Sequence, residues 1–343
     1  MVMGSAGCTA SDGETGTPTE WTPDPDRLRW RYWTGGRVPS SPVLYEGSLY
    51  VGSGDGHLRS FSPEDGSLNW KFETGDKIWS SPTAWNNTVY FGSNDHNLYA
   101  VNLDGEKRWH FETDDVIIGD PSVADGSVYV GSSDHNVYCL DSETGELQWT
   151  APTGNRVVSK PVANDGVVYA GSCDDNFYAF DATDGKTIWV FETDDAIYAN
   201  PVVSENRVFF GSTDHDFYAL DRHDGSELWT EHTRQRIVAA AAVWRDTVYF
   251  ANYLGWLHAL EADTGFRNWI SNELEPAVIC APTIVDGSLY IGDRFGWLRT
   301  FDADSGDLLA RFKTDNAVQS TPVVTDDTIY FGSNDGYVYA IKR

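Results

Sequence analysis

The chain has 343 residues, of which 52 are acidic and 24 are basic, giving a net charge of −28. So acidic a surface argues against nucleic acid as a partner, because phosphate binding needs a basic face. No apolar run approaches the ~20 residues that a transmembrane helix requires, so the sequence predicts no membrane-spanning segment.

Residues 1–27 precede the first predicted strand, and we expect them to form a flexible acidic tether. The stretch Thr9–Glu20 is rich in Ser, Thr, Gly and acidic residues, which is typical of a linker. Ser5-Ala6-Gly7-Cys8 resembles the end of a lipobox, in which the cysteine is lipidated after signal cleavage. Cys8 is therefore a candidate lipidation site. The charged and long apolar parts of a signal peptide do not precede it, so either the start codon was assigned too late or the match arose by chance.

From residue 28 onward the sequence repeats about every 40 residues, eight times. Each unit has a proline that opens an apolar segment and a tryptophan near its end. The prolines are Pro42, Pro82, Pro121, Pro161, Pro201, Pro282 and Pro322, with Ala241 in the same slot. The tryptophans are Trp30, Trp70, Trp109, Trp149, Trp189, Trp229 and Trp269, with Ala310 in the same slot. Such spacing indicates stacked copies of one supersecondary unit.

The unit at residues 80–119 shows what each repeat contains. Four short runs, at residues 82–85, 88–92, 97–101 and 107–113, have β-branched or aromatic residues at alternate positions, and polar turns separate them. No stretch has apolar residues at helical spacing over three turns. Four antiparallel strands with frequent turn signals predict one blade of a β-propeller.

The two ends of the repeat region are complementary. The last unit ends at residue 343 after three strands, and the missing strand that carries the tryptophan is found at residues 28–35. We therefore predict an all-β, eight-bladed propeller of four-stranded antiparallel blades, formed by residues 28–343 as a single domain. Pairing of the N-terminal strand with the last blade closes the ring and protects the sheet edges.

The turn before each tryptophan strand carries a recurring pattern. It reads Ala179-Phe180-Asp181, then Asp184-Gly185, then Trp189, and similar segments occupy residues 139–149, 219–229 and 259–269. This pattern resembles the A-x-D-x-x-T-G-x-x-x-W tryptophan-docking motif of the PQQ-like β-propeller repeat family. Some members are alcohol dehydrogenases that hold pyrroloquinoline quinone (PQQ) and Ca²⁺ in the central funnel. Others are non-enzymatic, among them the outer-membrane assembly lipoprotein of Gram-negative bacteria and many secreted or lipid-anchored archaeal proteins.

Comparison of the eight units separates positions that the fold dictates from positions that vary. The fourth residue before the proline slot is always Val or Ile, and the second is always small, so we expect one buried face. The residues between them vary and are predicted to line the mouth of the central channel. The candidate binding residues are four cations, two aromatic residues and a polar run from consecutive blades: Arg37, Lys77, Arg156, Arg236, Trp79, Tyr198, Asp120, Lys160 and Asn200.

Two interpretations of these candidates stay open. They could form a pocket for an anionic group or for a partner's acidic loop, held by short-range contacts. Alternatively, Asp120 pairs with Lys160 and the arginines pair with surrounding carboxylates. Turns such as Asn94-Asp95-His96-Asn97 resemble metal sites, but they recur once per blade and cannot converge on one ion, so we predict no metal site. Cys139 and Cys280 are predicted to be buried free thiols.

The resemblance and the residues together favour a non-enzymatic, extracytoplasmic scaffold that binds a protein or peptide as a monomer. We expect no catalytic residue and no cofactor. One alternative is a sensor that binds a small anion in the funnel. The other is a dehydrogenase using PQQ and Ca²⁺, which is disfavoured because the chain has no adjacent Cys pair and no Glu beside Asp120 and Asn200. The excess of acidic residues over lysines also resembles the surfaces of halophilic archaeal proteins.

Overall fold

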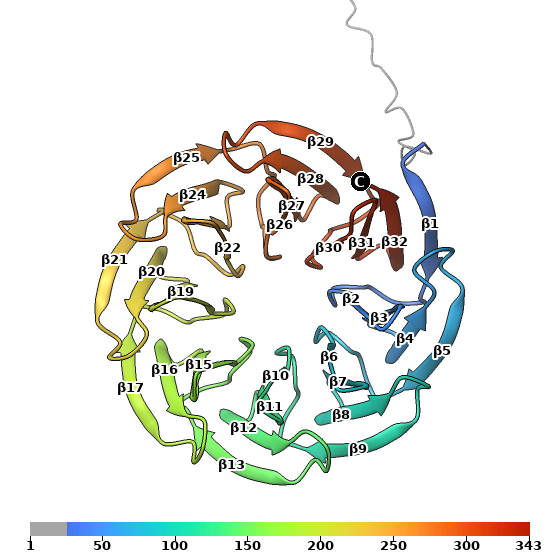
Figure 1. The fold of residues 1–343 in the computed structure, drawn as a ribbon, viewed down its shortest axis with the longest axis horizontal. Coiled ribbons are helices and arrows are strands. Elements are labelled where there is room, and N and C mark those ends of the chain that lie inside the picture. Colours follow the sequence, from blue (N-terminus) through green and yellow to red (C-terminus); the bar gives the residue numbers. More distant parts are fainter. Residues whose placement is uncertain (1–25) are drawn as a thin grey trace, which may run out of the picture.

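In the computed structural model, residues 26–343 form a ring of eight four-stranded antiparallel sheets around a central channel (Figure 1). These are the residues that the structure describes. The candidate lipidation site Cys8 and all but the last two residues of the predicted tether lie outside them. The predicted fold class and the number of blades are confirmed.

Seven blades are formed by consecutive strands, which run outward from the channel in chain order. The first four of these blades are β2 (Val43–Tyr45), β3 (Ser48–Gly52), β4 (His57–Phe61) and β5 (Leu68–Glu73); β6 (Thr83–Trp85), β7 (Thr88–Gly92), β8 (Asn97–Asn102) and β9 (Lys107–Glu112); β10 (Ser122–Ala124), β11 (Ser127–Gly131), β12 (Asn136–Asp141) and β13 (Leu147–Pro152); and β14 (Val162–Asn164), β15 (Val167–Gly171), β16 (Asn176–Asp181) and β17 (Thr187–Glu192). The other three are β18 (Val202–Ser204), β19 (Arg207–Gly211), β20 (Asp216–Asp221) and β21 (Glu227–His232); β22 (Ala242–Trp244), β23 (Thr247–Ala251), β24 (Leu257–Glu261) and β25 (Arg267–Ser271); and β26 (Thr283–Val285), β27 (Ser288–Gly292), β28 (Trp297–Asp302) and β29 (Leu308–Lys313).

The eighth blade combines the two ends of the described chain. It contains β30 (Val323–Val324), β31 (Thr328–Gly332), β32 (Tyr337–Lys342) and, as its outermost strand, β1 (Leu28–Trp33). Strand β1 is antiparallel to β32, with Trp30 opposite Ala340 and Trp33 opposite Tyr337. The predicted closure of the ring by the N-terminal strand is therefore confirmed.

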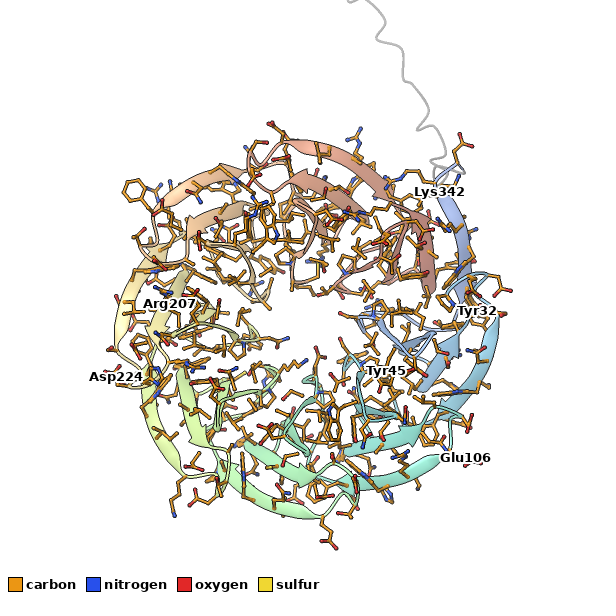
Figure 2. The ribbon with its side chains drawn as sticks, viewed as in Figure 1. Tyr32, Tyr45, Glu106, Arg207, Asp224 and Lys342 are labelled. Carbon is orange, nitrogen blue, oxygen red and sulfur yellow. The ribbon has the colours of Figure 1, made fainter. Side chains whose placement is uncertain are left out.

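The hydrophobic core lies between neighbouring blades. One cluster joins Tyr90 and Leu98 of one blade to Val128 and Val130 of the next, and similar clusters lie around the ring. With side chains drawn, Glu106 lies on the outer rim of the ring and Tyr45 lies on its inner side (Figure 2). Stability thus comes from successive contacts between blades, and the centre of the ring is left open for a site.

The recurring tryptophans fasten each blade to the next one. The Nε1 of Trp109 donates to the carbonyl oxygen of Ser142 at 3.1 Å, and the Tyr90 hydroxyl donates to the same oxygen at 3.0 Å. Gly145, with a φ of 74°, lies so close to the indole that a Cβ atom would be 2.6 Å from it. The same bond to the following blade is made by Trp30, Trp70, Trp149, Trp189, Trp229 and Trp269.

Ala310, which takes the place of the tryptophan on β29, faces a different neighbour. The equivalent turn would join β32 to β1, and these two strands come from opposite ends of the described chain. Arg343 crosses this seam instead: its Nε donates to the Tyr290 hydroxyl at 2.8 Å, and its Nη1 donates to Asp286 at 3.0 Å. One arginine therefore makes the contact between blades that a tryptophan makes elsewhere.

The buried face predicted before each proline slot is confirmed. Every Val or Ile of the fourth-residue slot and every small residue of the second-residue slot is buried. Cys139, Cys173 and Cys280 are buried and free, in agreement with the prediction for the first and third. Within residues 26–343, no helical segment has the length and hydrophobicity that crossing a bilayer requires.

His258 on β24 is a buried base without a hydrogen-bond partner, and it makes stability sensitive to acid. The side chain stacks on Phe250 at 4.8 Å, and its nearest carboxylate oxygen, on Glu231, is 4.0 Å from Nδ1. Burial, reinforced by the positive charge of Arg267, lowers the pKa of His258 to about 4. Because an unfolded histidine titrates near pH ~6.5, the unfolded state takes up the proton first. We therefore expect the free energy of unfolding to fall by about 3 kcal/mol as the pH drops from ~6.5 to ~4.

Urea unfolding of the parent and of the His258→Phe variant at pH 7 and pH 4 measures this contribution. The difference between the two proteins cancels the effect of the other titrating groups. An identical pH dependence in both proteins would show that His258 does not carry it.

Candidate functional site at the channel mouth

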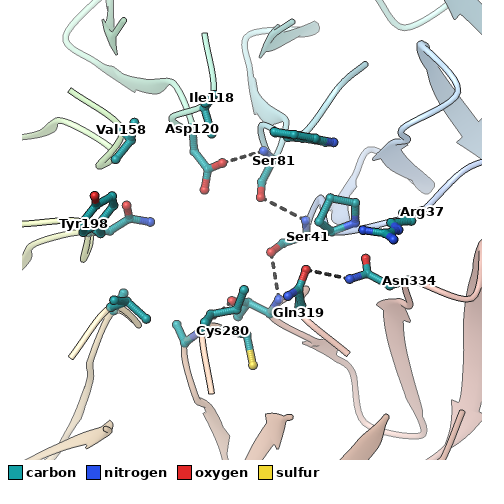
Figure 3. Close-up of a pocket in the computed structure, with 18 residues that line it drawn as sticks. Arg37, Ser41, Ser81, Ile118, Asp120, Val158, Tyr198, Cys280, Gln319 and Asn334 are labelled. Carbon is teal, nitrogen blue, oxygen red and sulfur yellow. Dashed lines mark hydrogen bonds between the residues drawn. The ribbon is translucent and has the colours of Figure 1, made fainter. Parts of the chain in front are cut away.

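Side chains from all eight blades line a cavity of about 440 Å³ in the channel (Figure 3). They belong mainly to the third and first residues before each proline slot, since the fourth and second are buried against the neighbouring blades. The lining comprises Arg37, Pro39, Ser41, Trp79, Ser81, Ile118, Asp120, Val158, Tyr198, Asn200, Val238, Ala240, Ile279, Cys280, Ala281, Gln319, Thr321 and Asn334.

Five of the nine predicted binding residues line this cavity: Arg37, Trp79, Asp120, Tyr198 and Asn200. The other four, Lys77, Arg156, Lys160 and Arg236, are not part of its lining. The structure thus brings together the aromatic and polar candidates, whereas three of the four predicted cations lie outside the cavity.

Those three cations each contact an aromatic ring. The ammonium of Lys77 is 5.6 Å from the ring centre of Trp79, and the guanidinium of Arg156 donates to the Tyr198 hydroxyl at 3.1 Å. Arg236 stacks over Tyr253, with 3.7 Å from Cζ to the ring centre. Cation–π contacts of this kind hold the charge in place without neutralising it.

The ion pairs of the second interpretation are not formed among residues 26–343. Neither Arg37 nor any of the three stacked cations has a carboxylate within 4.0 Å. Asp120 makes no ion pair with Lys160; its Oδ1 accepts from the main-chain N–H of Ser81 at 2.6 Å. Burial raises the pKa of Asp120, and the positive charge of Lys160 opposes this shift.

Hydrogen bonds between neighbouring blades account for most of the polar residues directly before the proline slot. In four blades, the main-chain N–H of this residue donates to the side-chain oxygen of the equivalent residue in the next blade. The four bonds run from Ala281 to Thr321, from Thr321 to Ser41, from Ser41 to Ser81 and from Ser81 to Asp120. A fifth bond runs from Lys160 to Asn200. The series is interrupted where the next residue is Lys160, Ala240 or Ala281. Among the described residues, the N–H groups of Asp120, Asn200 and Ala240 have no acceptor.

Two groups of lining residues were not among the binding residues predicted from the sequence. The apolar residues Ile118, Val158, Val238 and Ile279 share the register of Trp79 and Tyr198, and that register could have identified them. Asn334 comes from the turn between β31 and β32 and is held by Gln319, whose Oε1 accepts from its Nδ2 at 2.7 Å. No periodic signal in the sequence places that turn beside the channel.

The lining has little capacity for acid–base or metal chemistry. Asp120 is its one carboxylate, and the lining contains no histidine. Burial raises the pKa of the Cys280 thiol to about 12, so Cys280 is not a thiolate at neutral pH. In the part of the chain that the structure describes, no group of three or more His, Cys, Asp or Glu residues could hold a metal ion. In the repeated turns Asp95 accepts from the N–H of Asn97 at 3.1 Å, as expected for a turn that bonds its own backbone.

Two family models match the chain. One is described as "Beta-alanine-activating enzyme, beta-propeller" and matches residues 125–343. The chain belongs to this β-propeller family. A second model, described as "Outer membrane protein assembly factor BamB", matches residues 2–116 of the chain. Together with the fold, the two matches confirm the resemblance to PQQ-like repeat propellers that the tryptophan-docking motif indicated.

Solved structures share the fold of this propeller at low sequence identity. The computationally designed Ika8 protein aligns with a TM-score of 0.84 and 17% identity, covering 92% of this chain and 100% of its own. BamB from Moraxella catarrhalis gives 0.79 and 18%, covering 92% and 99%. A europium-containing methanol dehydrogenase gives 0.79 and 13%, covering 92% and 93%. These identities establish a common fold alone. No curated protein has significant sequence similarity to the chain.

Because the family resemblance includes quinoprotein dehydrogenases, the fit of a quinone-bound Ca²⁺ to the channel matters. Ca²⁺ takes about 6–8 oxygen ligands, several of them from carboxylates. Here the lining offers one carboxylate, on Asp120, and it already accepts a hydrogen bond from Ser81. The described cysteines are separate free thiols. The residues of the channel therefore do not fit PQQ with its cation.

Proposed function

We propose that this propeller is a non-enzymatic, extracytoplasmic scaffold that binds a protein or peptide on the face where the channel mouth opens. The observation that carries the proposal is the set of cations at the mouth that have no carboxylate partner among residues 26–343, on a chain with a net charge of −28. Such cations are available for charge-assisted hydrogen bonds with an acidic group of a partner.

The similarity to BamB supports this proposal and its location. BamB is described as an assembly factor for outer membrane proteins, and its model matches the N-terminal third of this chain. An extracytoplasmic position, with lipid attached at Cys8, accords with that similarity. The poor fit of PQQ to the channel lining makes the dehydrogenase alternative weaker.

A small anion bound within the channel is a second candidate function. The specific observation in its favour is the three main-chain N–H groups, of Asp120, Asn200 and Ala240, that have no acceptor among the described residues. Free N–H groups attract anions, and a cavity of about 440 Å³ has the size of a small-ligand pocket.

Site-specific photo-crosslinking tests the scaffold function. A photoreactive phenylalanine analogue replaces Trp79 at the channel mouth in one protein and replaces Thr183, in the turn between β16 and β17, in another. In membranes from the source organism, we expect discrete protein adducts from the position of Trp79 and none from that of Thr183. Adducts from neither position, or equal adducts from both, would contradict binding at the mouth.

A second experiment tests the enzymatic alternative: the purified parent protein is mixed with PQQ and Ca²⁺ in high salt. We expect no stoichiometric change in quinone absorbance and no dye-linked alcohol oxidation. Turnover would replace the scaffold proposal with the dehydrogenase alternative.

A further inference from the structure

The turn between the second and third strands has an aspartate at its third position in six of the eight blades. These residues are Asp55, Asp95, Asp134, Asp174, Asp214 and Asp335. In the blade of β6–β9, Asp95 Oδ2 accepts from the Tyr99 hydroxyl at 2.8 Å and from the N–H of Gly75, on the link from the preceding blade, at 2.7 Å. This carboxylate therefore joins the turn both to its own blade and to the link that precedes it.

Two adjacent blades, β22–β25 and β26–β29, depart from this rule. Leu254 and Phe295 occupy the aspartate position, and their side chains are 43% and 55% exposed. Two residues further on, Trp256 is 42% exposed and Trp297 is partly buried, where Asn97 and its equivalents are mostly polar. These exposed apolar side chains are not packed in the core, and their presence on turns of two adjacent blades indicates an interaction surface.

A groove with positive charge adjoins these turns. It has a volume of about 370 Å³, and its lining includes Arg37, Arg294 and Tyr253 but no Asp or Glu. Among residues 26–343, the guanidinium groups of Arg37 and Arg294 make no hydrogen bond and no ion pair. Arg236 lies against Tyr253 at 3.7 Å and adds a third cation. On so acidic a chain, a groove lined by arginines without carboxylates is complementary to negative charge.

We propose that this surface, formed by Leu254, Trp256, Arg294 and Phe295 with Arg37 across the groove, binds an extended peptide segment in which carboxylates alternate with bulky apolar side chains. Its carboxylates bond to the two arginines, for which a bidentate geometry is the strongest contact. Its apolar side chains cover Leu254 and Phe295. The inference rests on the scaffold function and names the chemistry of the partner.

The net charge explains why such a partner would be selective for this sector. An acidic peptide is repelled by most of the surface of a chain that has 52 acidic and 24 basic residues. The unpaired arginines attract it to this groove, and the exposed apolar residues bind it where salt screens the charges. Electrostatic complementarity thus sets the position of the peptide, and apolar contact contributes affinity.

Fluorescence anisotropy with the full chain tests the proposal. The probe is a fluorescein-labelled hexapeptide that alternates Asp with Phe, and two control peptides carry Asn in place of Asp or Ser in place of Phe. We expect the probe to bind the parent at least about tenfold more tightly than either control, a difference of ~1.4 kcal/mol. The Phe295→Asp variant installs the residue that six blades carry at this position, so it should fold and yet bind about tenfold more weakly.

A second variant and a matched control separate binding from folding. Arg294→Ala is expected to weaken binding of the probe and to leave binding of the Asn peptide unchanged. Ser133→Ala changes the same turn position in the blade of β10–β13 and should bind like the parent. Equal affinity of parent, Phe295→Asp and Arg294→Ala for the probe would overturn the proposal.

Self-association is the other occupant that the experiment detects. A concentration-dependent dimer in analytical ultracentrifugation that Phe295→Asp abolishes, with no binding of the probe, would assign the surface to a second copy and overturn the peptide proposal. If the probe fails to bind while crosslinks from the position of Trp79 persist, this inference fails and the scaffold function stands. If the position of Trp79 gives no protein crosslinks, the scaffold function itself is refuted.

Discussion

Deletion of residues 1–36 is expected to lower the melting temperature by about 10 °C or more and to cause aggregation. The deletion removes β1, which pairs with β32, and with it Trp30, whose Nε1 donates to the carbonyl oxygen of Pro63 in the next blade at 2.9 Å. Loss of a packed tryptophan alone costs about 3–5 kcal/mol, and each kcal/mol lowers the midpoint of a chain of this size by roughly 1.5 °C, to which the loss of the β1–β32 pairing adds. The unpaired edge of β32 would then be open to pairing with another chain.

Trp109→Ala is the matched control for this deletion. Its indole donates to Ser142 as that of Trp30 donates to Pro63, but its blade is one continuous run of chain, β6–β9. We expect the control to melt several degrees below the parent and to stay monomeric. Calorimetry gives the midpoints, and size-exclusion chromatography gives the oligomeric state. If the deletion melts like the parent, β1 does not close the ring in solution.

Repetition made the fold predictable from one sequence. Eight aligned copies show which positions keep one kind of side chain, so the sequence alone predicts the buried Val and Ile residues, the small residues and the tryptophans. The closing strand followed from the same alignment, since residues 28–35 supply what the last unit lacks. Even Ala310, the exception among the tryptophans, has a structural reason, because no turn joins β32 to β1.

The candidate site was less predictable, for physical reasons that its residues illustrate. The backbone register correctly predicts that Trp79 and Tyr198 face the channel, but the direction of a long cationic side chain depends on its neighbours. Thus Arg236 lies on Tyr253, outside the cavity. Ser41, Ser81 and Asp120 vary like binding residues, yet each accepts a hydrogen bond from an adjacent blade. A sequence does not separate that structural role from recognition of a ligand.

The turns that contain Leu254 and Phe295 could be recognised from the sequence only in part. Their departure from the repeated aspartate is visible in the sequence when the turns are compared unit by unit. Its meaning is not visible, because the sequence does not show that two adjacent turns expose apolar side chains beside a groove that contains unpaired arginines. Deviation from a repeat becomes informative only when the fold shows what surrounds it.

Replacement of Asp293 by Ser is expected to destabilise the propeller by about 3–5 kcal/mol. Asp293 and Arg299 form an ion pair in which the two residues are 1% and 4% exposed. Burial lowers the pKa of Arg299, although its charge persists at neutral pH. Serine occupies the equivalent position in six blades, so its size fits the turn. The loss would come from leaving the Arg299 charge buried without its partner.

A compensating variant shows whether charge is the cause. Asp293→Ser, Phe295→Asp and Arg299→Tyr together recreate the set that Ser93, Asp95 and Tyr99 form in another blade, where Asp95 accepts from the tyrosine hydroxyl. We expect urea unfolding to place this triple variant within about 1 kcal/mol of the parent, since it buries no unpaired charge. It should nevertheless bind the acidic peptide as weakly as Phe295→Asp alone. A single Asp293→Ser variant as stable as the parent would mean that Arg299 is neutralised by Glu273 or Glu275, whose charges also act on it. The Asp293–Arg299 pair would then fix the conformation of the Phe295 turn without adding to the stability of the blade.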